Sequence, residues 1–250
     1  MGFRRGWLPP LEFGLALLAL WWASSTFALV DQHFLPTPQS AVSRLLSGLQ
    51  SGYLWRALLV TLKEAVAGCV IAAAIGIPLG YAIAKSRVFS RISQPYLAAS
   101  QAIPAVAIAP LLTIWIGHGL ASVVVLCTIM VIFPIAVSTS VGVRQIDPEI
   151  IGAARLDGAA GLTLIRRIEV PLAAPTILSG IRTGFTLSIT GAIVGEMVMG
   201  GEGLGLLLGT AQQSSDVKGL FAIIILLAIS AVSIYGTLLL VERRANYLIS

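Results

Sequence analysis

The sequence predicts an all-α integral membrane protein with about six transmembrane helices. The first observation is composition, since 57% of the 250 residues are hydrophobic and only 11% are charged. Soluble domains carry about 25% charged residues. The second is the presence of apolar runs without any charge at 65–84, 92–143 and 219–241. A helix needs about 20 mostly apolar residues to cross a bilayer, so the middle run is long enough for two crossings.

The six helices are expected at Leu11–Val30, Ala57–Ala84, Tyr96–Gly117, Leu120–Val143, Thr176–Gly200 and Gly219–Val241. The first follows Arg4 and Arg5 and therefore resembles a signal peptide. Its Pro-Pro pair and its length of about 20 residues instead favour a retained membrane helix. We expect residues 1–250 to form a single transmembrane domain.

The distribution of lysine and arginine predicts the orientation of these helices. Cytoplasmic connections carry an excess of both residues. With the N-terminus inside, the cytoplasmic pieces hold Arg4, Arg5, Lys85, Arg87, Arg91, Arg144, Arg155, Arg166, Arg167, Arg243 and Arg244, and the outer pieces hold Arg44, Arg56 and Lys218. Both termini are therefore expected in the cytoplasm.

Two long outer segments and several helix-disturbing residues complete the outline. In 31–56, apolar residues recur at helical spacing from Val42 to Leu49, which predicts a short helix at the membrane surface. The Gly-rich segment 201–218 is expected to dip back toward the membrane. Glycines such as Gly76 and Gly80 allow close helix packing, and prolines such as Pro104 kink helices. These residues either pack the bundle or shape a transport path.

Several classes of function find no support in the residues. The basic residues lie between the apolar runs and form no patch that would indicate nucleic-acid binding. There are two histidines and no metal-ligand cluster, and no G-x-x-x-x-G-K-S/T phosphate loop occurs. Cys69 and Cys127 lie in apolar runs and are expected to be small buried residues. Any nucleotide hydrolysis must therefore come from another chain.

The segment 147–171 is unusually charged and rich in glycine for this chain. Asp147 is a candidate N-cap before Pro148, Gly158 and Gly161 would end or bend a first short helix, and Pro171 would stop a second. This pattern predicts a cytoplasmic helix–bend–helix with an apolar face that fits a groove on another protein. The alternative is a loop that only joins two membrane helices.

This segment resembles the cytoplasmic EAA loop of ABC-importer permeases, whose pattern is E-A-A-x3-G-x9-I-x-L-P. Its places are taken here by Gly152, Ala153, Ala154, Gly158, Ile168, Val170 and Pro171. The spacing is kept, but Gly152 replaces the glutamate and Val170 the leucine, so binding to an ATPase is expected to depend on shape more than on charge. The coupling residues that the resemblance implies are Gly152, Ala153, Ala154, Leu156, Asp157, Gly158, Ile168 and Pro171.

Further stretches, among them "QAIPAVAIAPLLTIWIGHG" and "GAIVGEMVMGGEGLG", resemble the branch of these permeases that imports nitrate, sulfonates, taurine, bicarbonate, pyrimidines or riboflavin. The resemblance implies a type I importer permease working by alternating access, with a coupling helix between helices four and five. It implies a homodimer with two cytoplasmic ATPases, which bind ATP and Mg, and an extracytoplasmic solute-binding protein. No cofactor and no enzymatic activity are expected in this chain, which belongs in a bacterial inner membrane.

Within that branch, the residues around Val106 and Pro110 look most like those of the riboflavin and thiamine-related pyrimidine permeases, which favours such a substrate over sulfonate, taurine, nitrate or bicarbonate. Candidates for the substrate path are Gln101, Trp115, His118, Glu196 and Met197. Glu196 is ionisable inside a membrane helix, where a function is the first expectation, although a structural hydrogen bond is the alternative. A channel or secondary carrier independent of ATP remains the competing class; an inverted repeat or a carboxylate relay would favour it.

Overall fold

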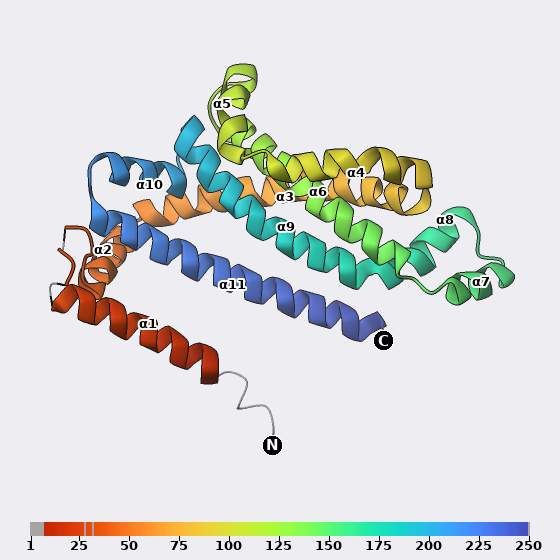
Figure 1. Cartoon of the computed structure of the whole chain (residues 1–250), viewed down its shortest axis with the longest axis horizontal. Coiled ribbons are helices and arrows are strands. Elements are labelled where there is room, and N and C mark those ends of the chain that lie inside the picture. The colour runs from red at the N-terminus through yellow and green to blue at the C-terminus, as the bar shows by residue number, and fades with distance from the viewer. Residues whose placement is uncertain (1–7, 28, 32, 250) are drawn as a thin grey trace. The chain divides into compact units, whose positions relative to one another are not determined.

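The computed structural model describes residues 8–27, 29–31 and 33–249, and every regular element in them is helical (Figure 1). The elements in order are α1 Leu8–Thr26, α2 Pro38–Gln50, α3 Tyr53–Lys85, α4 Arg87–Ala102, α5 Ala105–Ile116, α6 Leu120–Arg144, α7 Pro148–Leu156, α8 Gly161–Leu164, the π-helical turn η1 Ile165–Glu169, α9 Val170–Met199, α10 Leu204–Gln213 and α11 Val217–Ile249. The expected all-α class is confirmed.

Within the described residues, four helices are long and apolar enough to cross a membrane. They cover Tyr53–Lys85, Leu120–Arg144, Gly161–Met199 and Val217–Thr237. The 19-residue α1 stands where the first crossing is expected but is not one of these four. The number of six crossings therefore stays a prediction.

The expected single helix Tyr96–Gly117 is wrong, because the structure divides it into α4 and α5. Ile103 has an extended backbone, and Pro104 takes the N-cap position of α5. Proline disfavours helical geometry in the residue before it and has no N–H to donate. The break separates an apolar α5 of 12 residues from α4, which begins back at Arg87, in a stretch expected to be a connection.

The chain forms two compact units, of which the larger covers 57–206 and 229–250. In it α3 and α9 both pack on α6 through glycines. A Cβ at Gly76 would lie 2.8 Å from the Ile132 carbonyl oxygen, and one at Gly184 would lie 2.7 Å from Val131 Cγ1. The expected close helix packing is therefore present, with the buried Cys127 in the same core.

The smaller unit covers 1–56 and 207–228. The expected short helix around Val42–Leu49 is present as α2, where the Thr37 hydroxyl caps the first turn by accepting from the Ser40 N–H. Arg44 on this helix forms an ion pair of 2.9 Å with Asp216, which precedes α11. This pair ties two segments that are far apart in the sequence.

Candidate coupling segment and substrate path

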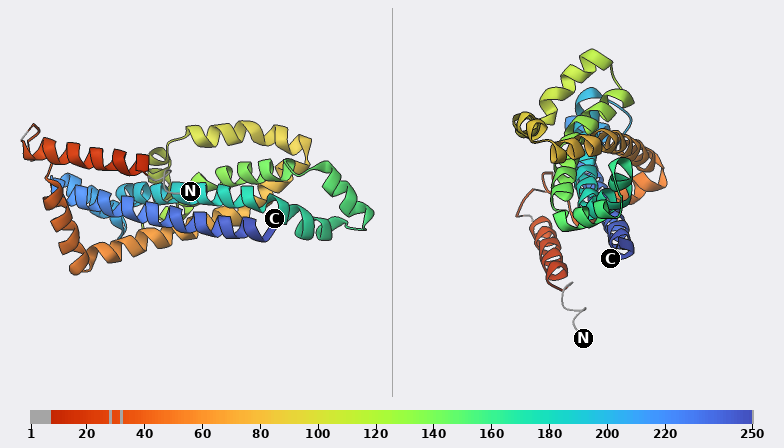
Figure 2. Two further views of the ribbon diagram at one scale, coloured as in Figure 1. Left: turned by 90° about the horizontal axis from the view of Figure 1, so that it is seen from below. Right: turned by 90° about the vertical axis from the view of Figure 1, so that its right-hand side faces the viewer.

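The segment 147–171 folds as the expected helix–bend–helix. The Asp147 carboxylate accepts a hydrogen bond of 2.8 Å from the Glu149 N–H at the start of α7. Gly158 and Gly161 have φ angles of +86° and +52°, a conformation that glycine adopts without steric cost. Figures 1 and 2 show α7 and α8 extending beyond the ends of α6 and α9.

The helical stop expected at Pro171 is wrong. The chain continues from Gly161 to Met199 as one long helical stretch that contains the π turn η1. Within η1 the Val170 N–H bonds to the Ile165 carbonyl, five residues back. Because the wider turn interrupts the regular ladder just before Pro171, the missing N–H of proline is accommodated there.

The first helix of the segment is almost uncovered, since α7 has no buried residue. Leu156 is 91% exposed, and Ile150 and Leu162 also point apolar side chains outward. Two cavities of about 300 and 280 Å³ border it, one lined by Gly152 and Arg155 and the other by Ile150. An apolar, uncovered helix beside hollows is suited to binding another protein.

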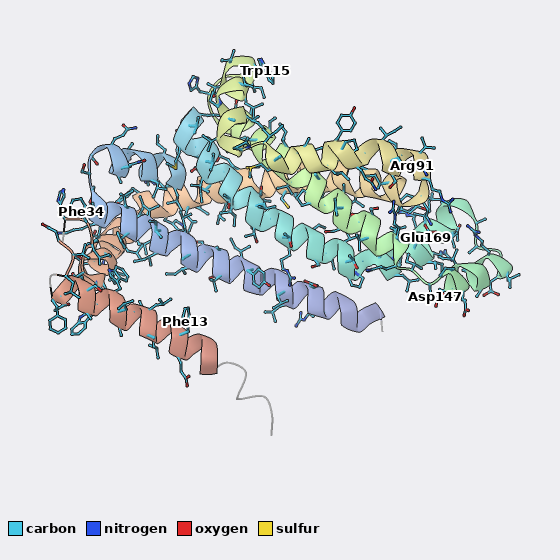
Figure 3. All side chains as sticks on the ribbon, in the orientation of Figure 1. Phe13, Phe34, Arg91, Trp115, Asp147 and Glu169 are labelled. Carbon is cyan, nitrogen blue, oxygen red and sulfur yellow. The ribbon has the colours of Figure 1, made fainter. Side chains whose placement is uncertain are left out.

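A buried glutamate that was not among the expected residues joins this segment to α3. The Glu169 side chain is 1% exposed, and its two carboxylate oxygens accept from the Tyr81 hydroxyl at 2.6 Å and from Lys85 Nζ at 2.7 Å. Figure 3 labels Glu169, which lies directly before the start of α9. An acidic residue beside an apolar run was the available signal, but its partners depend on how the helices pack.

Glu196 is completely buried and holds the turn that follows α9. Its Oε1 accepts from the Thr61 hydroxyl at 2.7 Å and its Oε2 from the Gly205 N–H at 2.5 Å. The Thr61 oxygen in turn accepts from the Leu204 N–H at 2.9 Å. These bonds satisfy N–H groups at the start of α10, which have no partner within that helix. They are the kind of contact that the structural alternative described.

A second carboxyl group lies in this buried cluster. Glu64 on α3 is also fully buried, and its carboxyl group contacts that of Glu196. Within the described chain, Glu64 Oε2 has no hydrogen-bond partner. Neither Glu64 nor Thr61 was among the expected residues, because both look like ordinary members of a long apolar helix until α3 is placed against α9.

The other path candidates are spread over separate places. Trp115 at the end of α5 is 72% exposed, and His118 and Met197 are exposed as well. Gln101 belongs to α4, but its side chain lies outside the described residues. In the part of the chain that the structure describes, no hydrogen bond or ring contact joins Trp115, His118 and Glu196. The structure thus brings Glu196 to Thr61 and Glu64 and not to the aromatic residues.

Comparison with known proteins identifies the class. Residues 76–247 match the family described as the binding-protein-dependent transport system inner membrane component. The riboflavin transport system permease protein RibX of Chloroflexus aurantiacus is 39% identical over 92% of this chain and 85% of its own length. The formylaminopyrimidine permease ThiX of Halalkalibacterium halodurans is 30% identical, over 89% and 88%. The taurine permease TauC of Escherichia coli is 29% identical, over 91% and 85%.

Solved structures give the same fold. The methionine ABC transporter MetNI, in an inward-facing conformation, matches with a TM-score of 0.71 at 19% identity, over 78% of this chain and 97% of that chain. An amino acid ABC transporter matches with a TM-score of 0.65 at 20% identity, over 80% and 98%.

The chain therefore belongs to the inner membrane components of binding-protein-dependent transport systems. It is the permease subunit of an ABC importer, a multi-pass membrane protein and not itself an enzyme. This result sets aside the competing class of channels and carriers that work without ATP.

Proposed function

We propose that this permease imports riboflavin or a thiamine-related pyrimidine compound, delivered by a solute-binding protein. The observation that carries the proposal is the 39% identity to a riboflavin permease along 92% of the chain. The lower identity of 29% to a taurine permease supports the alternative of a sulfonate-type substrate less well.

In this proposal residues 1–250 form one permease domain with six crossings and both termini in the cytoplasm. Two copies of the chain pair in the membrane, and each binds one cytoplasmic ATPase that holds ATP and Mg. The excess of lysine and arginine on the expected inner side supports the orientation. Closure of the ATPases on ATP switches the permease from inward-open to outward-open, and hydrolysis resets it.

The ATPase binds the coupling segment, through Gly152, Ala153, Ala154, Leu156, Asp157, Gly158, Ile168 and Pro171. The uncovered α7, with Leu156 exposed at its end, supports this assignment. A Cβ added at Gly152 would meet nothing within 4 Å, so the absence of the motif's glutamate leaves an open place at the surface. Contact with the ATPase therefore depends on the apolar side chains and on the bend.

Movement of the coupling segment reaches the membrane helices through Glu169. This residue lies in η1, directly after α8, and its bonds to Tyr81 and Lys85 end on α3. A displacement of α7 and α8 therefore pulls on α3 as well as on α9. Charge-assisted hydrogen bonds are shorter and roughly twice as strong as neutral ones, which makes them suited to hold this link while the segment moves.

The substrate path uses the exposed aromatic and polar candidates, Gln101, Trp115, His118 and Met197, with Glu196 at its buried side. The exposed Trp115 ring supports this choice, because an indole can stack on a flavin or pyrimidine ring. The hydrogen bonds of Glu196 to Thr61 and Gly205 support a positioning role, in which it holds the turn before α10.

The test is a ligand screen of the solute-binding protein that serves this permease, followed by uptake in proteoliposomes. We expect binding of riboflavin or a pyrimidine, and uptake of the same compound only when the ATPase and ATP are present. Binding of taurine or another sulfonate instead would overturn the substrate. Uptake that needs no ATP would overturn the coupling.

A further inference from the structure

The helix α4 carries two different stripes along its length. Arg87, Arg91 and Gln94 recur at spacings of four and three residues, and so lie on one face. Val88, Ile92 and Tyr96 recur every four residues on the adjacent face and are 69%, 56% and 66% exposed. A helix with a basic face beside an apolar face is typical of the membrane–water boundary.

The basic stripe borders a cavity of about 530 Å³. Its lining comprises Ala84, Arg87, Ser90, Arg91, Gln94 and Arg144, which come from the ends of α3 and α6 and from α4. Arg144 is held in place because its Nη2 donates to the Ile83 carbonyl at 2.8 Å and to the Ser90 hydroxyl at 2.9 Å. The guanidinium has five N–H donors, so it keeps others for a ligand.

The three arginines share an unbalanced positive charge. Among the described residues, no carboxylate lies within 4.0 Å of the guanidinium of Arg87, Arg91 or Arg144, and the ion pairs of this unit are formed by Lys85 and Arg182. Guanidinium groups bind phosphate oxygens in paired hydrogen bonds. Arg91 is labelled on α4 in Figure 3. An anion with several oxygens would therefore be attracted to these three arginines and could accept their hydrogen bonds.

The neighbouring apolar stripe indicates which kind of anion fits this cavity. A free phosphate would use the arginines but would make no contact with Val88, Ile92 and Tyr96. A phospholipid would fill both faces, with its phosphate in the cavity and its acyl chains along those three residues. The proposed orientation places this cavity on the cytoplasmic side of the membrane. Basic pockets between membrane helices on that side bind anionic lipid headgroups.

We propose that the cavity between the ends of α3, α4 and α6 binds the headgroup of an anionic phospholipid through Arg87, Arg91 and Arg144. The Ser90 hydroxyl completes the headgroup site, and the apolar stripe of α4 holds the acyl chains. The lipid thereby fixes α4 beside the membrane end of α3. This site is independent of which solute the importer carries.

The experiment counts bound lipids on the complete importer by native mass spectrometry. The permease–ATPase complex is purified in detergent, freed of lipid and given equal amounts of phosphatidylglycerol and phosphatidylcholine. We expect phosphatidylglycerol to be retained in preference. The double variant Arg87→Gln/Arg91→Gln should lower that retention by about tenfold or more, since each basic residue contributes to attraction at a membrane surface.

Three further arms complete the test. Arg56→Gln removes one positive charge outside the cavity and should leave the preference unchanged. Ile92→Ser keeps the charges but weakens acyl contacts, and should also lower retention. Inorganic phosphate should compete no better than chloride at equal ionic strength. The proposal is overturned if the double variant retains as much phosphatidylglycerol as the parent, or if phosphate alone displaces the lipid. It is also overturned if the double variant loses the ATPase and keeps the lipid.

Discussion

Asp216 accepts hydrogen bonds from two groups at once, and these bonds should make the stability of the fold depend on pH. Its carboxylate accepts from the Gly219 N–H and from Arg44, both at 2.9 Å. The Gly219 N–H, followed by the Arg44 guanidinium, holds the pKa of Asp216 below its usual value, and the hydrogen bond to Asp216 raises the pKa of Arg44. The folded chain therefore binds a proton at this carboxylate less readily than the unfolded chain does.

The sign of the pH dependence follows. A lowered pKa stabilises the fold above the unfolded value of about 3.9, and this contribution is lost as the pH falls through the lower, folded value. Asp216→Asn should therefore lower the melting temperature in detergent at pH 7. The difference from the parent should shrink as the pH falls below about 4. A difference that is constant with pH would contradict the assignment.

The second residue-scale prediction concerns Glu169. Glu169→Gln keeps the shape of the side chain but weakens the bonds from Lys85 and Tyr81, and hydrogen bonds to charged groups contribute about 1.5–3 kcal/mol each. We expect transport per ATP hydrolysed to fall, with basal ATP hydrolysis retained. Tyr81→Phe should have the same effect to a smaller degree. Glu202→Gln, at an exposed glutamate, is the matched control, and an equal loss there would contradict the proposed link.

At this scale the sequence identified residues better than it identified partners. Glu196 was predictable as an ionisable group in an apolar helix. Its contacts with Thr61 and Glu64 depend on the register between α3 and α9, which no local pattern encodes. The same holds for Glu169, which lies far from Tyr81 and Lys85 in the sequence.

Among the elements, the bend in the coupling segment has the clearest test. Gly158 has a φ of +86°, and a Cβ there would meet nothing within 4 Å. Gly158→Trp should therefore strain the bend and place a bulky group on the proposed ATPase-binding surface, while the bundle stays folded. We expect ATP hydrolysis to lose its dependence on substrate and transport to fall.

The matched control is Gly52→Trp, since Gly52 has a similar φ of +82° and open space but lies outside the coupling segment. It should carry the same backbone strain without uncoupling transport. If Gly158→Trp assembles and transports like the parent, the coupling role of the bend is wrong.

Packing between helices gives a second prediction at this scale. Gly76→Val places methyl groups against the Ile132 carbonyl, whereas a Cβ added at Gly236 on α11 would meet nothing within 4 Å. Overpacking costs about 1–3 kcal/mol, so Gly76→Val should lower the unfolding temperature in detergent clearly more than Gly236→Val does. Equal shifts would show that α3 and α6 are less tightly packed than the structure has them.

The helices illustrate which signals are local. The N-cap at Asp147 and the bend at Gly158 follow from residue types at fixed spacing, and the structure has both. The expectations at Pro104 and Pro171 are both wrong, although each is a proline in a helical pattern: the helix breaks at the first and continues through the second. What separates them is the π turn before Pro171. Its Glu169 is bonded to Tyr81 and Lys85 of α3, contacts that no local pattern encodes.

For the whole molecule, the composition alone was sufficient to predict an all-α membrane protein. The distribution of lysine and arginine in addition predicts an orientation in the membrane that can be tested. Leu156→Cys lies in the expected cytoplasmic segment and Glu202→Cys in the expected outer one, and both positions are exposed. The native Cys69 and Cys127 are buried. A membrane-impermeant maleimide should label Glu202→Cys in intact cells and Leu156→Cys only after permeabilisation. The reverse pattern would invert the orientation.

Because of the π turn between α8 and α9, the direction in which α7 faces depends on the number of residues in this segment. Successive residues of an α-helix are rotated by about 100° around its axis. Removing one residue from Ile165–Glu169 would therefore turn everything before it, α7 included, by about that angle relative to α9. In the proposed complex, the number of residues between Gly161 and Pro171 would thus set the direction in which Leu156 faces the ATPase.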